Sequence, residues 1–333
     1  MTSNVFISHT AVYHPENQVN NSYYIDYFDK QDKDIRRMLE AFGRENRYVS
    51  DREEENSLTM AIEAAKLVLR QAGLTGADLD ILVFSSGTPE YLAPSNAIHL
   101  HRALGGKENA LVYDMNANCV GMVIAVDQVS KYMQSDSRMQ RALIVGAEQM
   151  NRFSSRSNEV TLPNFGDAAC AIIVERAENG LSGFIDSYML TNSARSQVMA
   201  FPAKGLSRIY DASLSEDEKR IFWDTQDEGE ASFLLAARSI ETLLQRNHIE
   251  KQQIRKYFLS QLSQKNIERV RAELDEPHEK FIFVGDRFGY TGTSSPFIAL
   301  NEAERQDMLS RGDLVVFWSV GAGSISSCVL LKY

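Results

Sequence analysis

Residues 64–85 read AAKLVLRQAGLTGADLDILVFS, which predicts an amphipathic helix, a turn and an apolar strand. Residues 239–260 lie 175 positions later, read SIETLLQRNHIEKQQIRKYFLS and repeat this order of elements. The same shift carries 146–147, which follow the strand-like ALIV, onto 321–322, which follow LVVFWSV. One offset that relates two separate pairs of elements indicates an internal repeat, against the alternative that common helix–strand patterns match by chance.

Each repeat also ends in a β-rich run, AACAIIVERA at 168–177 and SSCVLLKY at 326–333. Continuous apolar strands between helices are typical of sheets that are covered on both faces. We therefore predict an α/β fold of two similar halves, stacked as a pseudo-dimer with shared central helices. The expected halves are 1–175 and 176–333. A polar stretch of irregular pattern, near 180–228, is interpreted as an insertion in the second half.

The composition of the 333-residue chain excludes several classes of protein. Hydrophobic residues make up 44% and charged residues 24%, which is ordinary for a globular protein and argues against a disordered or fibrous one. A net charge of −10 weighs against a nonspecific nucleic-acid binder. The apolar runs are too short to span a membrane, and the first residues do not resemble a signal peptide. Three cysteines without a CxxC pair fit a reduced protein, so we expect a cytoplasmic location.

One cysteine stands where a strand gives way to a helix. Residues 111–129 read LVYDMNANCVGMVIAVDQV and predict a helix that begins near Asn118 or Cys119. A helix N-terminus lowers the pKa of a thiol, and its free amides can stabilise the oxyanion formed in acyl transfer. The alternative is a buried cysteine that acts as a small hydrophobic residue. Cys170 and Cys328 lie in strand-like runs and are expected in the core.

Six segments that span nearly the whole chain resemble β-ketoacyl-acyl-carrier-protein synthase III, a condensing enzyme of the thiolase superfamily. The segments are AFGRENRYVSD (41–51), GTPEYLAPSNAIHLHRALG (87–105), DMNANCVGMVIAV (114–126), NFGDAACAIIVE (164–175), FGYTGTSSPFIAL (288–300) and SVGAGSISSCVLLKY (319–333). Their order and spacing match the family. The resemblance implies the thiolase fold, a five-layer αβαβα pseudo-dimer, and it implies that Cys119 is the acylated nucleophile.

The chain departs from the family at two catalytic positions. In the family, the cysteine works with a histidine that opens His-Gln-Ala-Asn and with an asparagine in Gly-Asn-Thr-Ser. The corresponding residues here are assigned as Gln261 and Tyr290. Both side chains carry hydrogen-bond donors, but neither is a base near neutral pH. Since losing one oxyanion donor commonly costs ~10²–10³ in rate, we expect malonyl decarboxylation to be slow or absent.

The resemblance implies two further positions near the substrate. The backbone N–H of Ala322 is expected to be the second oxyanion donor, in a turn where the family has glycine. Ala93 stands where the family has a large aromatic residue that reaches the acyl pocket of the partner subunit. A small residue there could admit acyl chains longer than acetyl. The alternative is that Tyr91 or Leu92 fills the same volume.

Arg44 and Arg47 are candidate ligands for a phosphate of coenzyme A, with an exposed surface pair as the alternative. Asp167, in the run FGDAA, is expected to fix a turn through hydrogen bonds to the backbone rather than to take part in chemistry. No metal site and no cofactor are expected beyond acyl-CoA or acyl carrier protein as a substrate.

The leading hypothesis for function is an acyltransferase that forms an acyl thioester on Cys119. It would pass the acyl group from coenzyme A or acyl carrier protein to an acceptor in specialised or fatty-acid-related biosynthesis. One alternative is a catalytically degenerate subunit that pairs with a paralogous condensing enzyme. Another is a true decarboxylating synthase with an altered set of donors. By resemblance we expect a homodimer, with a heterodimer as the second option, and no nucleic-acid or membrane partner.

Overall fold

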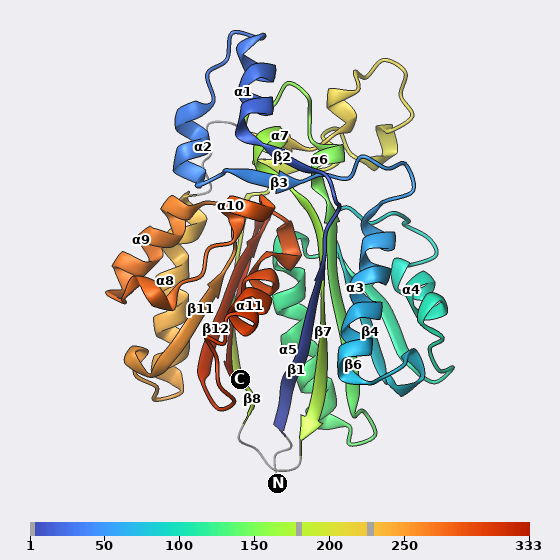
Figure 1. Ribbon diagram of the computed structural model, residues 1–333, viewed down its shortest axis with the longest axis vertical. Coiled ribbons are helices and arrows are strands. Elements are labelled where there is room, and N and C mark those ends of the chain that lie inside the picture. Colours follow the sequence, from blue (N-terminus) through green and yellow to red (C-terminus); the bar gives the residue numbers. More distant parts are fainter. Residues whose placement is uncertain (1–3, 178–181, 225–229) are drawn as a thin grey trace.

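The computed structural model describes residues 4–177, 182–224 and 230–333, and its core contains two mixed sheets (Figure 1). The strands of the first sheet are β1 (Asn4–Tyr13), β4 (Ile81–Ser85), β5 (Leu111–Met115), β6 (Arg141–Gln149) and β7 (Asp167–Ala177). Their order is β1-β7-β6-β4-β5. Strand β4 runs parallel to β5 and β6, whereas β7 runs antiparallel to β1 and β6.

The second sheet repeats this arrangement with one strand fewer among the described residues. Its strands are β8 (Gly183–Arg195), β11 (Ile254–Leu259), β12 (Leu314–Gly321) and β13 (Gly323–Lys332), in the order β11-β12-β13-β8. Strands β11 and β12 are parallel, and β13 runs antiparallel to β12 and β8. These four strands therefore correspond to β4, β6, β7 and β1 in order and direction.

The helix–strand segments that predicted the repeat occupy equivalent places in the two halves. They are α3 (Ser57–Ala72) followed by β4, and α8 (Glu230–Arg246) followed by β11. The predicted α/β fold of two similar halves is thus confirmed. The strands of the first sheet all lie before residue 178 and those of the second all lie after residue 182. The division into domains at 175 and 176 stays a prediction.

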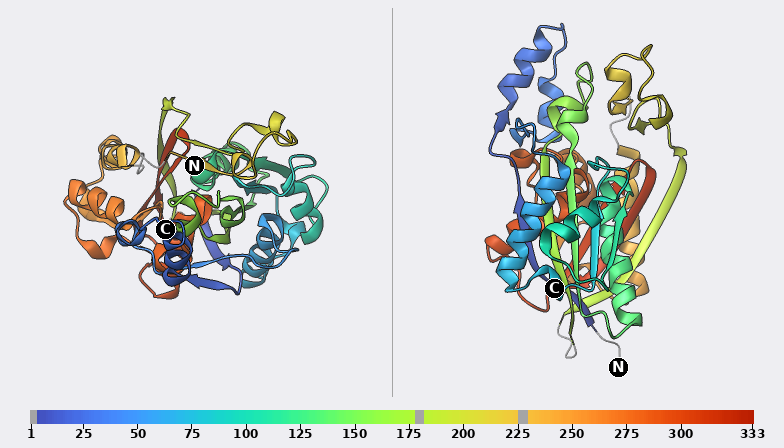
Figure 2. Two further views of the ribbon diagram at one scale, coloured as in Figure 1. Left: turned by 90° about the horizontal axis from the view of Figure 1, so that it is seen from above. Right: turned by 90° about the vertical axis from the view of Figure 1, so that its right-hand side faces the viewer.

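Helices cover both faces of each sheet and make five layers (Figures 1 and 2). Helices α5 (Gly121–Ser135) and α11 (Ser295–Arg305) lie between the sheets and contact strands of both. Helices α3 and α4 (Asn96–Leu104) cover the outer face of the first sheet. Helices α8 and α9 (Gln264–Leu274) lie on the outer side of the second. The main core, between the sheets, therefore surrounds the helix that follows Cys119.

Shorter elements gather mainly at one end of the sheets, at the top of Figure 1. They include β2 (Gln18–Asn20), α1 (Asn21–Asp29), α2 (Arg36–Phe42), β3 (Asn46–Tyr48), α6 (Met150–Phe153), α7 (Thr161–Asn164), β9 (Met199–Ala200), β10 (Phe222–Trp223) and α10 (Gly285–Phe288). The 3₁₀ turns in the described ranges are η1 (Gly76–Asp78), η2 (Asn118–Val120), η3 (Leu206–Arg208), η4 (Asp217–Lys219), η5 (Lys251–Gln253), η6 (His278–Lys280) and η7 (Gly292–Ser294). Within the described ranges, every helix is too short or too polar to cross a bilayer.

The insertion predicted near 180–228 begins later than expected. Residues 183–195 form β8, an integral strand of the second sheet, and the excursion covers 196–224. Because β8 has a neighbour on one side and many exposed positions, it carries polar residues that hide its strand character. The ends of the predicted segment, 180–181 and 225–228, lie outside the described residues.

A close contact between α5 and the first sheet fixes the segment that carries the cysteine. A side chain at Gly121 would displace the hydroxyl of Ser85, so glycine permits this close approach. The N–H of Met122 donates to Thr293 Oγ1 at 2.8 Å, and that hydroxyl lies 3.0 Å from Ser85 Oγ. Turn η7, which contains Thr293, precedes α11 as η2 precedes α5. The two halves thus hold each other at the starts of their central helices.

Candidate active site

Cys119 lies in η2, directly before the 15-residue helix α5. The turn requires a left-handed backbone at Asn118, where φ is 52°, a conformation that asparagine tolerates better than most residues. Ser319 Oγ donates to the carbonyl of Cys119 at 2.7 Å and ties the turn to β12. The predicted position of the thiol at a helix N-terminus is confirmed, and its side chain is 7% exposed.

The expected low pKa of this thiol is wrong. Burial raises the pKa of Cys119 from 9.0 to about 12, and the negative charge of Glu148 raises it further. A hydrogen bond from Tyr290 opposes the shift without cancelling it. Since a thiolate loses most of its hydration in such a site, desolvation outweighs the favourable field of the helix. The thiol is therefore protonated at neutral pH in this state of the protein.

Tyr290 brings a hydroxyl to the sulfur of Cys119. Its side chain is 2% exposed, and its backbone is paired with the first half through Asn164 O and the N–H of Gly166, at 2.8 and 3.0 Å. The phenol hydrogen-bonds to the thiol and lies 3.1 Å from Ser260 Oγ. Burial raises the pKa of Tyr290 well above its usual value, so the phenol stays protonated and can donate.

Gln261 does not reach the thiol, and its expected role as a donor in the site is wrong. Its amide nitrogen donates to Leu259 O and Ile282 O at 2.8 and 3.1 Å. Its amide oxygen accepts from the N–H of Val284 at 2.8 Å. Both hydrogens of the amide are therefore used by main-chain carbonyls. The side chain that this loop presents to Tyr290 is that of Ser260, one residue earlier.

Ser260 is the functional candidate that the sequence assignment missed, although the repeat contained a signal for it. Ser260 ends the second copy of the repeat as Ser85 ends the first. Ser85 bonds to Thr293 at the start of α11, and Ser260 bonds to Tyr290, which bonds to Cys119 at the start of α5. The same strand-end serine thus faces the start of the opposite central helix in both halves.

Glu148 is a second residue that the sequence did not single out. Its carboxylate is 2% exposed and accepts hydrogen bonds from the N–H groups of Gly87 and Thr88, both at 3.0 Å. The hydroxyls of Thr88 and Ser86 also donate to it, at 2.6 and 3.3 Å. Burial raises the pKa of Glu148, whereas these donors lower it. This buried carboxylate lies near the cysteine, and a negative charge on it disfavours the thiolate form of Cys119.

Two small cavities meet at the thiol. One has a volume of about 60 Å³ and is lined by Cys119, Tyr290 and mostly apolar residues, with Arg195 and Ser324 also in its wall. The other has a volume of about 40 Å³ and contains Glu148 in its wall. Ala322 lines both cavities, so the turn predicted to supply an oxyanion donor lies beside the sulfur. The role of its N–H stays a prediction.

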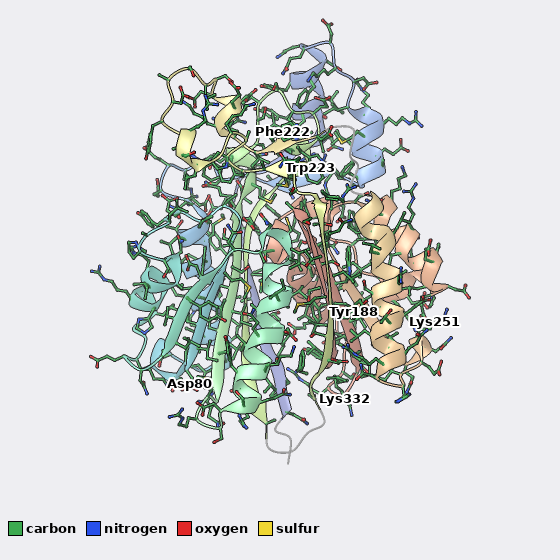
Figure 3. All side chains as sticks on the ribbon, turned by 180° about the vertical axis from the view of Figure 1, so that it is seen from behind. Asp80, Tyr188, Phe222, Trp223, Lys251 and Lys332 are labelled. Carbon is green, nitrogen blue, oxygen red and sulfur yellow. The ribbon has the colours of Figure 1, made fainter. Side chains whose placement is uncertain are left out.

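Residues of the excursion line part of both cavities. Strands β9 and β10 pair, with Met199 opposite Trp223, and both side chains line the cavity that contains Tyr290. Figure 3 shows Phe222 and Trp223 at the end of the molecule opposite Asp80 and Lys332. Residues of β9 and β10 also line a larger cavity of about 680 Å³. The excursion therefore contributes to the walls of this cavity and of the cavities at the thiol.

The structure leaves Ala93 on the surface and does not place it at the thiol of its own chain. Ala93 lies before α4 beside Tyr91 and Leu92, which are 45% and 71% exposed. The expectation for Ala93 concerns the pocket of a partner subunit, so it stays a prediction.

Both arginines proposed for a coenzyme A phosphate are buried, so that prediction and the alternative of an exposed pair are wrong. Arg44 is 2% exposed and Arg47 is fully buried. Arg44 donates to main-chain carbonyls that include Gln261 O at 2.9 Å, and Arg47 donates to Pro163 O at 2.8 Å. Most of the hydrogen bonds of these guanidinium groups go to backbone oxygens, and the groups are not exposed to bind a phosphate.

Asp167 has the structural role that was predicted for it. Its two carboxylate oxygens accept from the N–H groups of Ser50 and Asn151, both at 2.9 Å. Burial raises the pKa of Asp167 to about 7. Among the described residues, no cluster of three or more histidine, cysteine or acidic side chains is arranged to hold a metal ion.

Comparisons with known proteins identify the fold and the family. Residues 113–193 match the family model for 3-oxoacyl-(acyl-carrier-protein) synthase III, and residues 244–333 match the model for its C-terminal part. The chain is 27% identical over 330 residues to the β-ketoacyl-(acyl-carrier-protein) synthase III of Clostridium novyi, with 99% of each chain covered. It is 29% identical over 329 residues to that of Wolbachia pipientis, with coverage of 98% and 99%.

A solved structure extends the comparison to three dimensions. The crystal structure of 3-oxoacyl-(acyl-carrier-protein) synthase III from Aquifex aeolicus matches with a TM-score of 0.86 and 25% identity, covering 99% of this chain and all of that one. The fold is thus that of the thiolase superfamily. The chain belongs to the β-ketoacyl-acyl-carrier-protein synthase III-like condensing enzymes.

Proposed function

We propose that this protein is an acyltransferase that carries the acyl group as a thioester on Cys119. The donor is an acyl-CoA or an acyl carrier protein. The observation that carries the proposal is the thiol at the start of α5, which faces two cavities and is hydrogen-bonded to Tyr290. Membership of the family supports the reaction class.

The acylation step exchanges one thioester for another. Cys119 Sγ attacks the acyl carbon, a new S–C bond forms, and the C–S bond of the donor breaks. The proton of Cys119 ends on the departing thiol, so no external base is consumed. Tyr290 donates to the sulfur as it gains charge, and Ser260 supports the phenol. The N–H groups of Cys119 and Ala322 are the proposed donors to the oxyanion.

The acceptor in the second step is proposed to be an alcohol, an amine or a preformed carbon nucleophile. Neither cavity has a histidine in its described lining, and the amide of Gln261 is used by the backbone. The side-chain donors that connect to the thiol are the hydroxyls of Tyr290 and Ser260, and Arg195 also lines the cavity. This set supports acyl transfer better than decarboxylation of a malonyl thioester. Release of labelled CO₂ from malonyl substrates, at a rate above a Cys119→Ser control, would contradict this choice.

The cavities support a short acyl group. An apolar cavity of about 150 Å³ holds a benzene ring. Cavities of about 60 and 40 Å³ therefore suit two to four heavy atoms before lining side chains move. Ala93 of a partner subunit could enlarge the site in a dimer. Exposure to acetyl-, hexanoyl- and octanoyl-CoA, followed by intact mass measurement, decides between the two sizes.

A second candidate function is that of a non-catalytic subunit paired with a complete paralogue. The high pKa of the thiol and the withdrawn amide of Gln261 favour it. The exposed edge of the first sheet, where Leu111 of β5 is 39% exposed, supports pairing of subunits in either case. A purified homodimer that transfers acyl groups alone excludes this second function.

Protection from alkylation tests the main proposal. Iodoacetamide should label Cys119 in the free protein, and prior incubation with acyl-CoA should prevent the labelling. Cys170 and Cys328 are fully buried and serve as internal controls for unfolding. Labelling of Cys119 that acyl-CoA leaves unchanged would count against the proposal.

A further inference from the structure

Arg44 joins the N-terminal segment to the two loops that carry the hydroxyl groups of the site. Its Nη2 donates to Gln261 O and Leu262 O at 2.9 and 2.6 Å, and its Nη1 donates to Gly285 O at 2.9 Å. These acceptors lie more than 200 positions later in the chain. One planar guanidinium thus holds both loops at a fixed separation.

Gln261 completes this contact from within the second half. Its side chain links the end of β11 to Ile282 and Val284 through the bonds described above. The first of the two loops contains Ser260. The second continues into α10, where Gly289 N donates to Gly285 O at 3.2 Å, and then reaches Tyr290. The spacing of Ser260 and Tyr290 therefore depends on the contacts of Arg44 and Gln261.

Burying the guanidinium group of Arg44 costs free energy of desolvation, which a residue with a packing role alone would not require. Its described hydrogen-bond acceptors are carbonyl oxygens, and its Nε has no hydrogen-bond partner among the described residues. Desolvation lowers the pKa of Arg44 from 12.5 to about 9. Because an apolar side chain would be cheaper to bury, this arrangement indicates a requirement for defined geometry.

We propose that Arg44 is a positioning residue that sets the hydrogen-bonded chain from Ser260 through Tyr290 to the sulfur of Cys119. The residue does not line either cavity at the thiol, so it acts through the loops and not on the substrate. A role of Arg44 in catalysis rests on the proposed function. An effect of Arg44 on the reactivity of the Cys119 thiol can be measured whether or not that function is correct.

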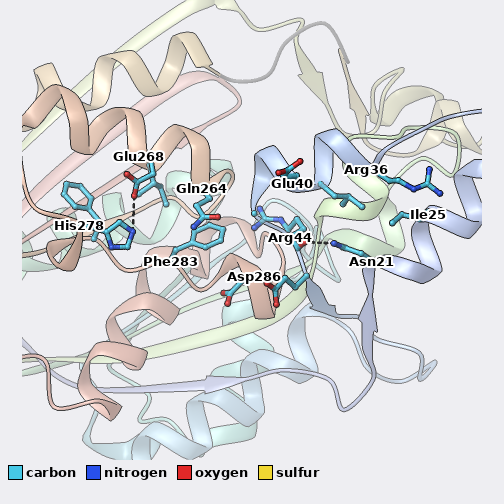
Figure 4. Close-up of a pocket in the computed structure, with 15 residues that line it drawn as sticks. Asn21, Ile25, Arg36, Glu40, Arg44, Gln264, Glu268, His278, Phe283 and Asp286 are labelled. Atoms are coloured by element: carbon cyan, nitrogen blue, oxygen red, sulfur yellow. Dashed lines mark hydrogen bonds and ion pairs between the residues drawn. The ribbon is translucent and has the colours of Figure 1, made fainter.

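An open cavity lies beside the buried Arg44. The cavity has a volume of about 620 Å³ and lies between α2 and α9, with Arg44 in its wall (Figure 4). Figure 4 shows Arg44 between Phe283 and Asn21. A small guanidinium compound can therefore reach the space left by an Arg44→Ala substitution, which permits chemical rescue.

A double-mutant cycle between Arg44 and Tyr290 tests the inference. The measurement is the rate of Cys119 alkylation by iodoacetamide at pH 9. Tyr290→Phe removes the donor to the sulfur and should slow alkylation by about tenfold or more. Arg44→Ala should slow it by about tenfold, because small displacements of such groups are costly. The double variant should match Tyr290→Phe within about twofold.

Further variants separate geometry from charge and from stability. Arg44→Lys keeps the charge but lacks the planar fork whose two nitrogens reach the separate carbonyls, so it should behave like Arg44→Ala. Added guanidinium should restore part of the rate to Arg44→Ala and none to Tyr290→Phe. Arg311→Ala is the matched control, since Arg311 also donates to two carbonyls, Ile7 O and Ser8 O, at 2.7 Å. It should alkylate like the wild type.

The outcomes distinguish this inference from the proposed function. Additive effects in the double variant, or wild-type alkylation in Arg44→Ala, would overturn the positioning role. If the cycle is non-additive but acyl-CoA never acylates the wild type, the proposed function fails and the positioning role stands. Melting temperatures of all variants identify any loss of rate that reflects unfolding.

Discussion

Glu148→Gln is the substitution that should make the thiol more reactive. The carboxylate and Cys119 line the same cavity of about 40 Å³, and the negative charge of Glu148 contributes to the raised pKa of the thiol. With a pKa of about 12, only about one thiol in 10⁴ is ionised at pH 8. Removing a neighbouring negative charge lowers the pKa of a thiol, so the thiolate population rises.

The magnitude follows from the closeness and burial of the two groups. Removing one such charge should increase the thiolate population by about tenfold, equivalent to about 1.4 kcal/mol. The same substitution weakens the hydrogen bonds that Glu148 accepts from Gly87 and Thr88. Bonds to charged groups contribute about 1.5–3 kcal/mol each, so the variant should also melt at a lower temperature.

The assay is the initial rate of iodoacetamide labelling at pH 8, read by peptide mass spectrometry. Glu304→Gln is the matched control, because Glu304 is partly buried, also has a raised pKa and bonds to Thr10 and Tyr333 away from the thiol. It should leave the labelling of Cys119 unchanged. A Glu148→Gln variant that is folded and labels no faster than the wild type would refute the electrostatic reasoning.

Three further predictions concern stability and accessibility. Asp167 keeps its proton up to about pH 7 in the folded state but releases it near pH 4 when unfolded, so the stability of the protein should fall as the pH rises from about 4 to about 7. Asp167→Asn should remove this contribution to the change of melting temperature with pH. A side chain at Gly166 would collide with the carbonyl of Phe288, so Gly166→Ala should cost about 1–3 kcal/mol in urea unfolding. Cys170 and Cys328 should react with iodoacetamide only after denaturant is added; labelling under native conditions would contradict their burial.

The fold could be predicted from the sequence because its helix–strand pattern occurs in both halves of the chain. The helix–turn–strand pattern of 64–85 recurs at 239–260, and apolar strands keep their character wherever they are buried. Residues 183–195 are not predicted as a strand, because an edge strand with a polar face has no continuous apolar signal. Local pattern therefore predicts central strands better than edge strands.

The place of the candidate nucleophile was also predictable, but the pKa of its thiol was not. The position of Cys119 before an apolar helix is a local property of the sequence. The pKa of its thiol depends on burial and on Glu148, which contacts the site only after folding. The local sequence indicates the helix dipole, which lowers the pKa of the thiol. It does not indicate the desolvation by burial, which raises this pKa by more.

The loop after β11 shows the limit of motif alignment. A motif assigns Gln261 to a catalytic position, but the direction of a side chain depends on where the strand ends and on partners from Arg44 and Val284. A shift of one residue brings Ser260 to Tyr290. The sequence does not show that Arg44 is buried, because the carbonyl groups that it contacts belong to a distant segment of the chain.

Direct detection of an acyl group on the sulfur of Cys119 is the sharpest test of this account. The purified protein is incubated with acetyl-CoA and digested at low pH, and the peptide containing Cys119 is examined by mass spectrometry. We predict one acetyl group on this peptide, which neutral hydroxylamine removes and which Cys119→Ser abolishes. An unmodified Cys119 peptide under conditions in which the protein still transfers acyl groups would contradict the account.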